Sequence, residues 1–175
     1  MGAVSPPDIF ATYAPLYLQR GLVPLPITLG TKACNVRGWN KLDPAVDQDR
    51  FQEFIKSKAH FGIGVRMGTI FPDGSRLVAI DVDHDDHVNV VRYLLRDLVS
   101  GRVGQKGALF FVRFKGRAPN KKVETASGIK TADMLFANAC CVIPPTIHKD
   151  TGQPYKWIGQ PLHEVAFESL PLIEG

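Results

Sequence analysis

An apolar run that ends in two carboxylates constrains this chain more than any other feature. Residues 77–80, Leu-Val-Ala-Ile, are typical of a buried strand, and Asp81, Val82 and Asp83 follow them directly. Side chains two residues apart on a strand share a face and lie about 6.5 to 7 Å apart at the backbone. Both carboxylates can therefore reach one or two hard divalent cations, and without a cation they would repel each other. The pattern predicts a metal site at the tip of this strand.

The same stretch allows two other interpretations. Residues 81–87, Asp-Val-Asp-His-Asp-Asp-His, are also typical of a polar loop in which Asp85 or Asp86 caps the next helix. A metal-dependent phosphohydrolase would be equally compatible with Asp81 and Asp83 alone. The motif is too short to separate these functions by itself.

Composition narrows the class of protein. The chain has 175 residues, 45% of them hydrophobic, which is enough for one domain with a substantial core. A formal net charge of +4 allows a nucleic-acid or nucleotide partner without requiring one. The three cysteines have no Cys-x-x-Cys spacing, which argues against a disulfide framework and a zinc site and favours a reducing compartment. No segment approaches the ~18 apolar residues that span a bilayer, and no signal peptide is evident, so we expect a cytoplasmic protein with no membrane partner.

The hydrophobic periodicity alternates between helix and strand. It predicts helices at 9–17, 47–55 and 88–98, a short one at 162–167, and strands at 22–27, 62–65, 76–83, 108–114, 133–136, 139–143 and 155–158. The prolines of the first strand favour a sheet edge. The turn at residues 72–75 favours a hairpin between the strands on either side of it. We expect an α+β class with a mixed or mostly antiparallel sheet flanked by helices, in a single unit over residues 1–175.

Two further segments carry candidate phosphate-binding residues. Gly104-Gln105-Lys106-Gly107 precedes a strand, so that backbone N–H groups, Lys106 and Arg113 could contact a phosphate, although an ordinary basic turn has the same pattern. In Pro144-Pro145-Thr146-Ile147-His148, the prolines predict an extended approach that delivers His148. A structural histidine is the alternative there.

Taken in order, these segments resemble the bifunctional primase/polymerase (prim-pol) domain of phage and plasmid replication proteins, within the archaeo-eukaryotic primase superfamily. The most specific element is Pro-Pro-x-x-His at residues 144–148, followed by Gly152 and Tyr-x-Trp at 155–157. The other matching segments are residues 22–26 with Gly30-Thr31-Lys32 and Gly38-Trp39, the glycine-containing segment 61–68, the first acidic motif at 77–83, and Asp133 ahead of an apolar strand.

The resemblance implies an archaeo-eukaryotic primase-like fold and a function. The fold would combine an RRM-like half with flanking helices. The function would be template-directed nucleotidyl transfer from nucleoside triphosphates, dNTP or NTP, on a single-stranded DNA template with a primer. Asp81, Asp83 and Asp133 would be the catalytic carboxylates that hold two Mg²⁺ or Mn²⁺ ions, which suit hard oxygen ligands. A helicase domain or another replisome component would be a partner, and the chain could be one domain of a longer replication protein.

The resemblance also implies a set of basic residues. Lys106, Arg113, His148 and Lys130 would contact the nucleotide, and Lys32, Arg37 and Arg66, together with Lys121 and Lys122, could follow template phosphates. One position departs from the pattern: the histidine of the superfamily's second motif falls at Leu109. Lys106 or Arg113 is then expected to take over the triphosphate contact. The departure also motivates a second hypothesis, a non-catalytic nucleic-acid or origin-binding replication initiator domain that retains the fold.

Overall fold

The computed structural model describes residues 7–117, 122–124 and 130–175. These described residues contain three α-helices and ten strands, and the strands form two sheets, so the α+β prediction is confirmed. The helices are α1 (Ile9–Gln19), α2 (Gln48–Ser57) and α3 (Asp85–Leu95), with short 3-10 helices at Trp39–Lys41 and Phe167–Ser169. The strands are β1 (Pro24–Ile27), β2 (Gly62–Arg66), β3 (Arg76–Val82), β4 (Ser100–Val103), β5 (Ala108–Lys115), β6 (Lys122–Glu124), β7 (Lys130–Leu135), β8 (Cys140–Ile143), β9 (Lys156–Gly159) and β10 (Leu172–Glu174).

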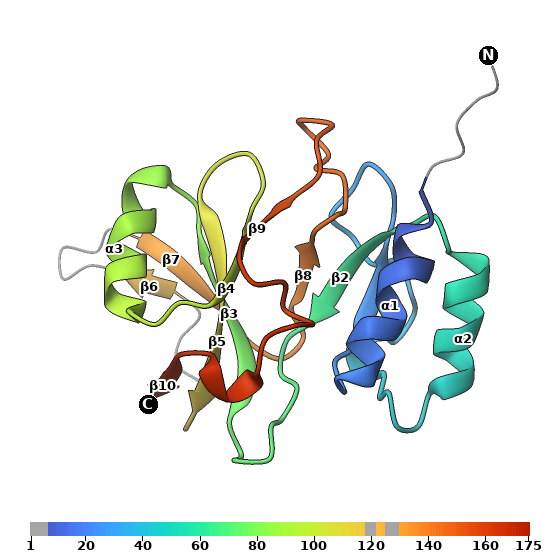
Figure 1. The fold of residues 1–175 in the computed structure, drawn as a ribbon, viewed down its shortest axis with the longest axis horizontal. Coiled ribbons are helices and arrows are strands. Elements are labelled where there is room, and N and C mark those ends of the chain that lie inside the picture. Colours follow the sequence, from blue (N-terminus) through green and yellow to red (C-terminus); the bar gives the residue numbers. More distant parts are fainter. Residues whose placement is uncertain (1–6, 118–121, 125–129) are drawn as a thin grey trace.

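The smaller sheet has the order β1-β2-β8, and the larger one has the order β6-β7-β3-β5-β4-β9. All pairs are antiparallel except that of β10, which runs parallel to β5 beyond the end of β4. Strand β1 lies at a sheet edge, as its prolines predicted. Helices α1 and α2 lie at one end of the molecule beside the smaller sheet, and α3 lies at the other end (Figure 1).

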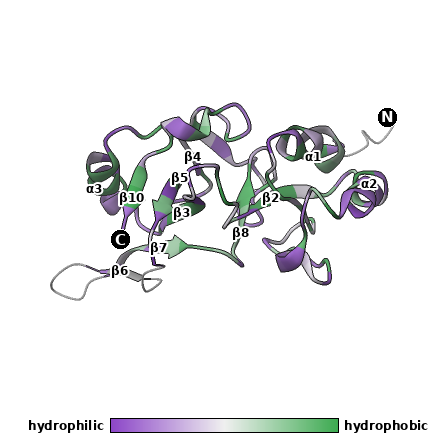
Figure 2. Ribbon diagram, turned by 90° about the horizontal axis from the view of Figure 1, so that it is seen from below, coloured by the Kyte–Doolittle hydropathy of each residue, from purple (hydrophilic) through white to green (hydrophobic). Residues whose placement is uncertain are grey.

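The alternation of side chains along β3 and β5 divides the core into two layers. One face of the larger sheet packs toward the smaller sheet, α1 and α2 through Leu77, Ala79, Leu109 and Phe111. The opposite face packs against the Val91 side of α3 through a second set of buried residues: Val78, Ile80, Val82, Phe110, Val112 and Phe114. Hydrophobic residues follow most strands, and the helices carry both hydrophobic and hydrophilic residues (Figure 2).

The predicted hairpin forms at its turn, where Ile70 lies opposite Arg76 and the Leu77 N–H donates to the Thr69 carbonyl, but the strand at 62–65 takes no part in it. The Phe71 N–H donates to the Ser75 carbonyl at 2.8 Å. Strand β2 nevertheless pairs with β1 and β8, and β3 pairs with β5 and β7. The reason lies in the glycines of β2: a Cβ at Gly62 would lie 2.5 Å from Thr146 Cγ2, and one at Gly64 would lie 2.7 Å from Cys140 Sγ. The glycines therefore fit β2 to β8 and the segment that follows it.

Two other differences concern local signals. The predicted helix at 162–167 is absent; turns, a 3-10 helix and β10 occupy residues 162–174. Strand β4 was not expected, because Gly101 resembles a stop signal for the preceding helix. In the structure α3 ends at Leu95, and Gly101 allows β4 to approach β5, since a Cβ there would lie 2.7 Å from the Leu109 carbonyl oxygen.

The turn between β4 and β5 is fixed against the end of β3. Gly107 has φ +65, and a Cβ at this position would lie 1.8 Å from the Val82 carbonyl oxygen. The Gly107 N–H donates to Asp85 Oδ1 at 2.7 Å. Asp85 is the first residue of α3, so this hydrogen bond ties the helix to the turn. The sequence had suggested Asp85 or Asp86 as the helix cap, but His84 occupies the cap position. These contacts hold the turn that carries Lys106 next to Asp81 and Asp83.

We expect Gly107→Ala to destabilise the protein far more than Gly21→Ala. The two glycines have similar φ values, +65 and +70, but no atom lies within 4 Å of a Cβ at Gly21. The control therefore carries only the left-handed strain of about 1 to 2 kcal/mol, and Gly107→Ala adds the clash with Val82. Thermal unfolding should show a melting temperature lower for Gly107→Ala than for the control by at least about 4 °C. Equal melting temperatures would contradict this packing.

Candidate active site

The strand register places the central residues of the site in one row across the larger sheet. Asp81 of β3 lies directly opposite Asp133 of β7 on one side and Leu109 of β5 on the other. Leu109 in turn lies opposite Arg102 of β4. Directly opposed residues share a face and have Cβ atoms about 4.5 to 5.5 Å apart. The row Asp133, Asp81, Leu109, Arg102 therefore presents two acids and one base on the same face of the sheet.

Asp81 is the most constrained carboxylate of the row. It is partly buried near the end of β3. Among the described residues, no ion pair or hydrogen bond reaches its carboxylate. Burial raises its pKa above the ordinary value, and the charges of Asp83 and Asp133 add to this effect against the opposing influence of Arg102 and Lys32. The ionised form of Asp81 thus costs free energy that a bound cation would recover.

Asp83 and Asp133 share a cation supplied by the chain. Lys130 Nζ lies 3.0 Å from Asp83 Oδ2 and 2.6 Å from Asp133 Oδ2. These two hydrogen-bonded pairs, with Asp133 the stronger influence, raise the pKa of Lys130. All three side chains are partly exposed to solvent, so the ammonium can be displaced without opening the fold. Lys130 therefore lies on the carboxylate side of the site.

The donor set suits a hard divalent cation. Asp81, Asp83 and Asp133 offer only carboxylate oxygens, the ligand type that Mg²⁺ and Mn²⁺ prefer. Within residues 7–117, 122–124 and 130–175, however, no three acidic, histidine or cysteine side chains already converge as a metal-binding group. Lys130 occupies the position between Asp83 and Asp133. The residues fit a cation chemically, provided that Lys130 moves and the three carboxylates turn toward one another.

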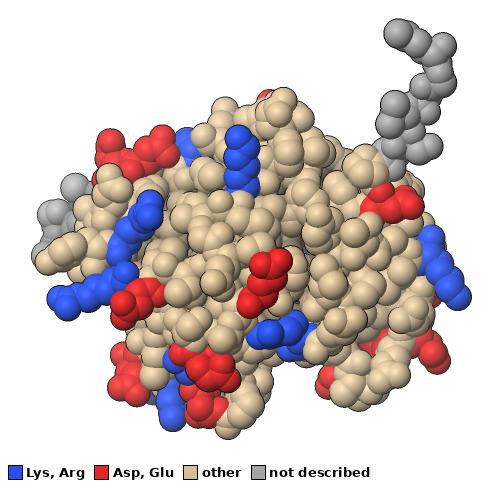
Figure 3. Space-filling view, viewed as in Figure 1, with Lys and Arg blue, Asp and Glu red and all other residues tan. Residues whose placement is uncertain are grey.

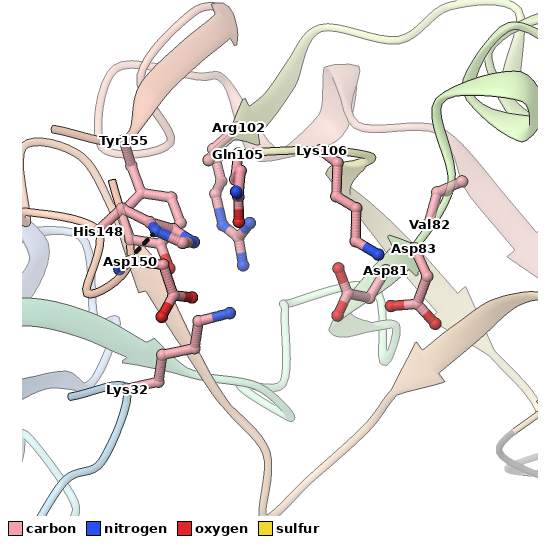
Figure 4. A pocket seen from close by; sticks show the side chains of 11 residues that line it. Lys32, Asp81, Val82, Asp83, Arg102, Gln105, Lys106, His148, Asp150 and Tyr155 are labelled. Atoms are coloured by element: carbon pink, nitrogen blue, oxygen red, sulfur yellow. Dashed lines mark hydrogen bonds between the residues drawn. The ribbon is translucent and has the colours of Figure 1, made fainter. Parts of the chain in front are cut away.

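A pocket beside the row brings together side chains from separate segments. Three acidic residues, three basic residues, His148 and Tyr155 contribute to its lining: Asp81, Asp83, Asp150, Lys32, Arg102, Lys106, His148 and Tyr155. Figure 4 shows the three cationic side chains extending into one hollow, with Asp81 and Asp83 on one side and His148 and Asp150 on the other. The pocket can therefore hold an anionic group next to the metal-type carboxylates.

Lys106 is the sequence-predicted phosphate ligand that the structure brings to this pocket most directly. It belongs to the turn that Asp85 and Gly107 fix against β3. Lys32, predicted as a template contact, also reaches the pocket, from the loop between β1 and α2. Elsewhere on the surface shown in Figure 3, acidic and basic side chains are interspersed. Cations of different segments meet in the pocket because the fold, and not a basic run in the sequence, places them there.

The segment after β8 positions His148. The Pro144–Pro145 bond is cis, and the Thr146 N–H donates to the Ile143 carbonyl, so the prolines form a turn instead of the predicted extended approach. The Thr146 hydroxyl then accepts the Ile63 N–H at 2.7 Å and donates to the Ile63 carbonyl at 3.0 Å. This buried pair of hydrogen bonds attaches the Pro-Pro-Thr-Ile-His segment to β2.

His148 is buried, with 5% of its surface exposed, yet it lines the pocket. Its Nδ1 accepts the Asp150 N–H at 3.2 Å, so in the neutral ring the proton is on Nε2. Burial lowers its pKa, and the cationic Lys32 and Arg102 lower it further. His148 is therefore suited to donate a hydrogen bond from Nε2 as a neutral group.

Arg113, predicted to contact the nucleotide, does not reach this pocket. It shares a sheet face with Leu109 but lies four residues along β5, about 13 Å away at the strand rise. Its Nη1 pairs with Asp73 at 2.8 Å, and its Nε and Nη2 donate to the carbonyls of Leu170 and Glu168. The prediction placed Arg113 on the correct face of the strand but overlooked its distance from Leu109 along the strand. Arg113 fixes the segment before β10.

The remaining predicted template contacts lie on the side of the smaller sheet. Arg37 is exposed on the loop between β1 and α2, next to Trp39. Arg66 is partly buried at the end of β2, and this burial lowers its pKa. Lys121 and the side chain of Lys122 lie outside the described residues.

Arg102 was not found from the sequence, and Tyr155 was noted only as part of the Tyr-x-Trp segment and not as a site residue. Arg102 donates from Nε to the Val142 carbonyl at 2.9 Å, and its guanidinium carbon lies 4.7 Å from the centre of the Tyr155 ring. The sequence signal was present, because a serine, a glycine and a basic residue precede the Gly104 turn by two to four positions. It was hidden because that segment was taken as the end of the helix.

Comparison with protein families gives one match. The family model for the N-terminal domain of bifunctional DNA primase/polymerases matches residues 14–172. The chain therefore belongs to the Prim-Pol family, and its primase-like fold follows from that membership. No curated protein matches the sequence. Among the described residues, no helix is long and apolar enough to cross a membrane.

We expect Asp81→Asn to raise the melting temperature of the ligand-free protein by a few degrees at pH 7. Because the folded-state pKa of Asp81 is raised, its ionisation destabilises the fold above that pKa and has no effect well below the unfolded value near 3.8. The gain should therefore shrink as the pH falls toward 4. Thermal unfolding at several pH values measures it.

Asp86→Asn, an exposed carboxylate on α3, removes the same charge outside the pocket and serves as the control. A destabilised Asp81→Asn protein at pH 7, or a gain that is the same at pH 4, would show that burial does not strain this carboxylate.

Proposed function

We propose that this chain is a DNA primase/polymerase domain that catalyses template-directed nucleotidyl transfer from nucleoside triphosphates on single-stranded DNA. The observation that carries the proposal is the placement of Asp81 beside Asp133 on one side and close to the cationic pocket on the other. Sites of phosphoryl transfer commonly combine carboxylates that hold a metal with cations that hold the phosphates. Membership of the Prim-Pol family supports the same assignment.

Asp81, Asp83 and Asp133 would hold Mg²⁺ or Mn²⁺ in this proposal. The bound metal would supply Lewis-acid chemistry, which favours loss of the 3′-hydroxyl proton to solvent water and offsets charge on the pyrophosphate. In the transfer, the bond between the 3′-oxygen and the α-phosphorus forms while the bond from that phosphorus to the bridging oxygen breaks. Pyrophosphate then leaves with the electron pair of the broken bond. The chain's own contribution is to position the triphosphate and to exclude other orientations.

Lys106 and His148 are the proposed nucleotide contacts among the residues predicted from the sequence. Lys106 would neutralise phosphate charge from the fixed turn, and His148 would donate from Nε2. Lys130 would turn from the carboxylates toward the phosphates when a divalent cation replaces it. Lys32, Arg37 and Arg66 are proposed to follow the template strand, Lys32 nearest to the reacting groups.

The substrates and partners follow from the same proposal. They are a single-stranded template, a primer, a dNTP or NTP, and a helicase domain or other replisome component. The core shared by both sheets, α1 and α2 supports one catalytic unit over residues 1–175.

Primer extension tests the catalytic proposal. The protein is incubated with a primed single-stranded template, nucleoside triphosphates and Mn²⁺. We expect the double variant Asp81→Ala/Asp83→Ala to lose at least about 1,000-fold in rate, because it removes two of the three proposed metal carboxylates. This loss corresponds to about 4 kcal/mol of transition-state stabilisation. Asp86→Ala, which removes an exposed acid of α3, should retain the wild-type rate. Catalysis is excluded if the wild type extends no faster than the double variant.

A non-catalytic replication initiator or nucleic-acid-binding domain is the second candidate. Leu109 favours it, because this buried side chain stands where the superfamily has a histidine. Such a domain would bind DNA with a salt-dependent affinity but would have no metal-dependent affinity for nucleotides. Calorimetric titration of dATP with and without Mn²⁺ separates the two, since tight Mn²⁺-dependent binding is expected only of the primase/polymerase.

Lys130→Gln tests whether Lys130 competes with the cation. We expect this variant to bind Mn²⁺ up to about fivefold more tightly than the wild type, since partly exposed ion pairs are weak and Lys130 competes only modestly with the cation. Calorimetric titration with MnCl₂ measures the change. Lys56→Gln, an exposed lysine on α2, should bind Mn²⁺ as the wild type does. Weaker binding by Lys130→Gln would show that Lys130 assists the metal site instead of competing with it.

A further inference from the structure

Arg102 places a cation in the pocket without an acidic partner. Its Nε–H donates to the Val142 carbonyl at 2.9 Å, and its guanidinium lies over the Tyr155 ring. Among the described residues, no carboxylate forms an ion pair with it. These two contacts fix the side chain and leave the terminal Nη groups available. Figure 4 shows the guanidinium directed into the hollow between Lys32 and Lys106.

Tyr155 adds an independent observation at the same place. Only 3% of its surface is exposed, it lines the pocket, and its hydroxyl group has no hydrogen-bond partner among the described residues. Burial raises its pKa, so the hydroxyl keeps its proton at neutral pH. A buried hydroxyl without a partner is unfavourable in a folded protein. A ligand oxygen in the pocket would satisfy it.

Glycine at position 104 allows the turn between β4 and β5 to pack closely against Tyr155 and His148. A Cβ there would lie 2.7 Å from Tyr155 Cε1 and 2.9 Å from His148 Cδ2. The turn can therefore pack directly onto both rings, which lie 5.0 Å apart between centroids. His148, Tyr155 and the Gly104 turn form a wall beside Arg102.

The strand register explains why Arg102 can contact a ligand in place of a polar residue at position 109. Leu109 is 1% exposed, and Asp81 and Arg102 lie directly opposite it on the two neighbouring strands. A polar side chain at 109 would lie between them, but leucine contributes only to the core. The first polar group on the β4 side of Asp81 is therefore the guanidinium of Arg102.

We propose that Arg102 and the Tyr155 hydroxyl group bind the triphosphate of the incoming nucleotide and supply the contact that Leu109 cannot make. A guanidinium can donate two parallel hydrogen bonds to one phosphate group. The site is partly buried and lies next to the carboxylates. This location suits the terminal triphosphate of a nucleotide better than a phosphate within a DNA chain. This inference rests on the proposed function, because it assigns the phosphate-binding side of that site.

Calorimetric titration of two variants with dATP in the presence of Mn²⁺ tests the assignment. We expect Arg102→Gln to weaken dATP binding by about 10- to 100-fold, the range for a lost charge-assisted hydrogen bond. Arg102→Lys, which retains the charge and loses the planar fork, should recover only part of the affinity. Arg92→Gln, an exposed arginine on α3, removes the same charge elsewhere and should bind as the wild type does.

Tyr155→Phe provides a test that does not remove the ring beneath Arg102. We expect it to weaken dATP binding by about 3- to 10-fold and to leave the ligand-free protein at least as stable in thermal unfolding, because the hydroxyl has no partner there. A variant that loses stability and retains dATP affinity would assign this hydroxyl a purely structural role and overturn its part of the proposal.

Binding of a single-stranded oligonucleotide separates the possible failures. For Arg102→Gln we expect this affinity to stay within about twofold of the wild type. If it falls as much as dATP affinity does, or if dATP affinity is unchanged, Arg102 is not a triphosphate ligand and the proposed function stands without it. If the wild type binds the oligonucleotide but no dATP with Mn²⁺, both the assignment and the proposed function are wrong.

Discussion

The pairing of β3 with β5 and β7 is the constraint on which the rest of the structure depends. It buries the run from Leu77 to Ile80 on both faces and fixes Asp81 between Asp133 and Leu109. Because opposed side chains share a face, a shift of one residue would turn Asp81 toward α3 and empty the site of its central carboxylate. The hydrophobic core of the larger sheet and the position of the acidic groups are therefore set by the same register.

This arrangement has an energetic cost that is consistent with its proposed use. Opposed carboxylates are unfavourable on neighbouring strands, and burial makes the ionised form of Asp81 less stable still. Lys130 relieves the repulsion at Asp83 and Asp133 but makes no ion pair with Asp81 among the described residues. The chain thus supplies a partial and displaceable counter-charge. A divalent cation would complete the neutralisation, and the cations of the pocket would receive a triphosphate beside it.

Sequence patterns predicted the features that depend on residues close together in the chain. The buried strand at 76–83, the edge strand with its prolines, the α+β class and the family resemblance were confirmed, because periodicity and turn residues carry this information. The hairpin partner of β2 and the short strand β4 were missed, since both depend on glycines that allow a close approach. Arg113 was placed on the correct face at the wrong distance, and Arg102 was overlooked because only the register brings it level with Asp81.

The most direct test of the account is the position of bound metal in a crystal of the protein grown with Mn²⁺ and a non-hydrolysable triphosphate. Anomalous scattering from manganese locates the ions without reference to the chain. The account predicts manganese peaks coordinated by Asp81 together with Asp83 or Asp133, with Lys130 displaced and the triphosphate contacting Arg102 and Lys106. Manganese bound away from Asp81, with Lys130 still between Asp83 and Asp133, would contradict it.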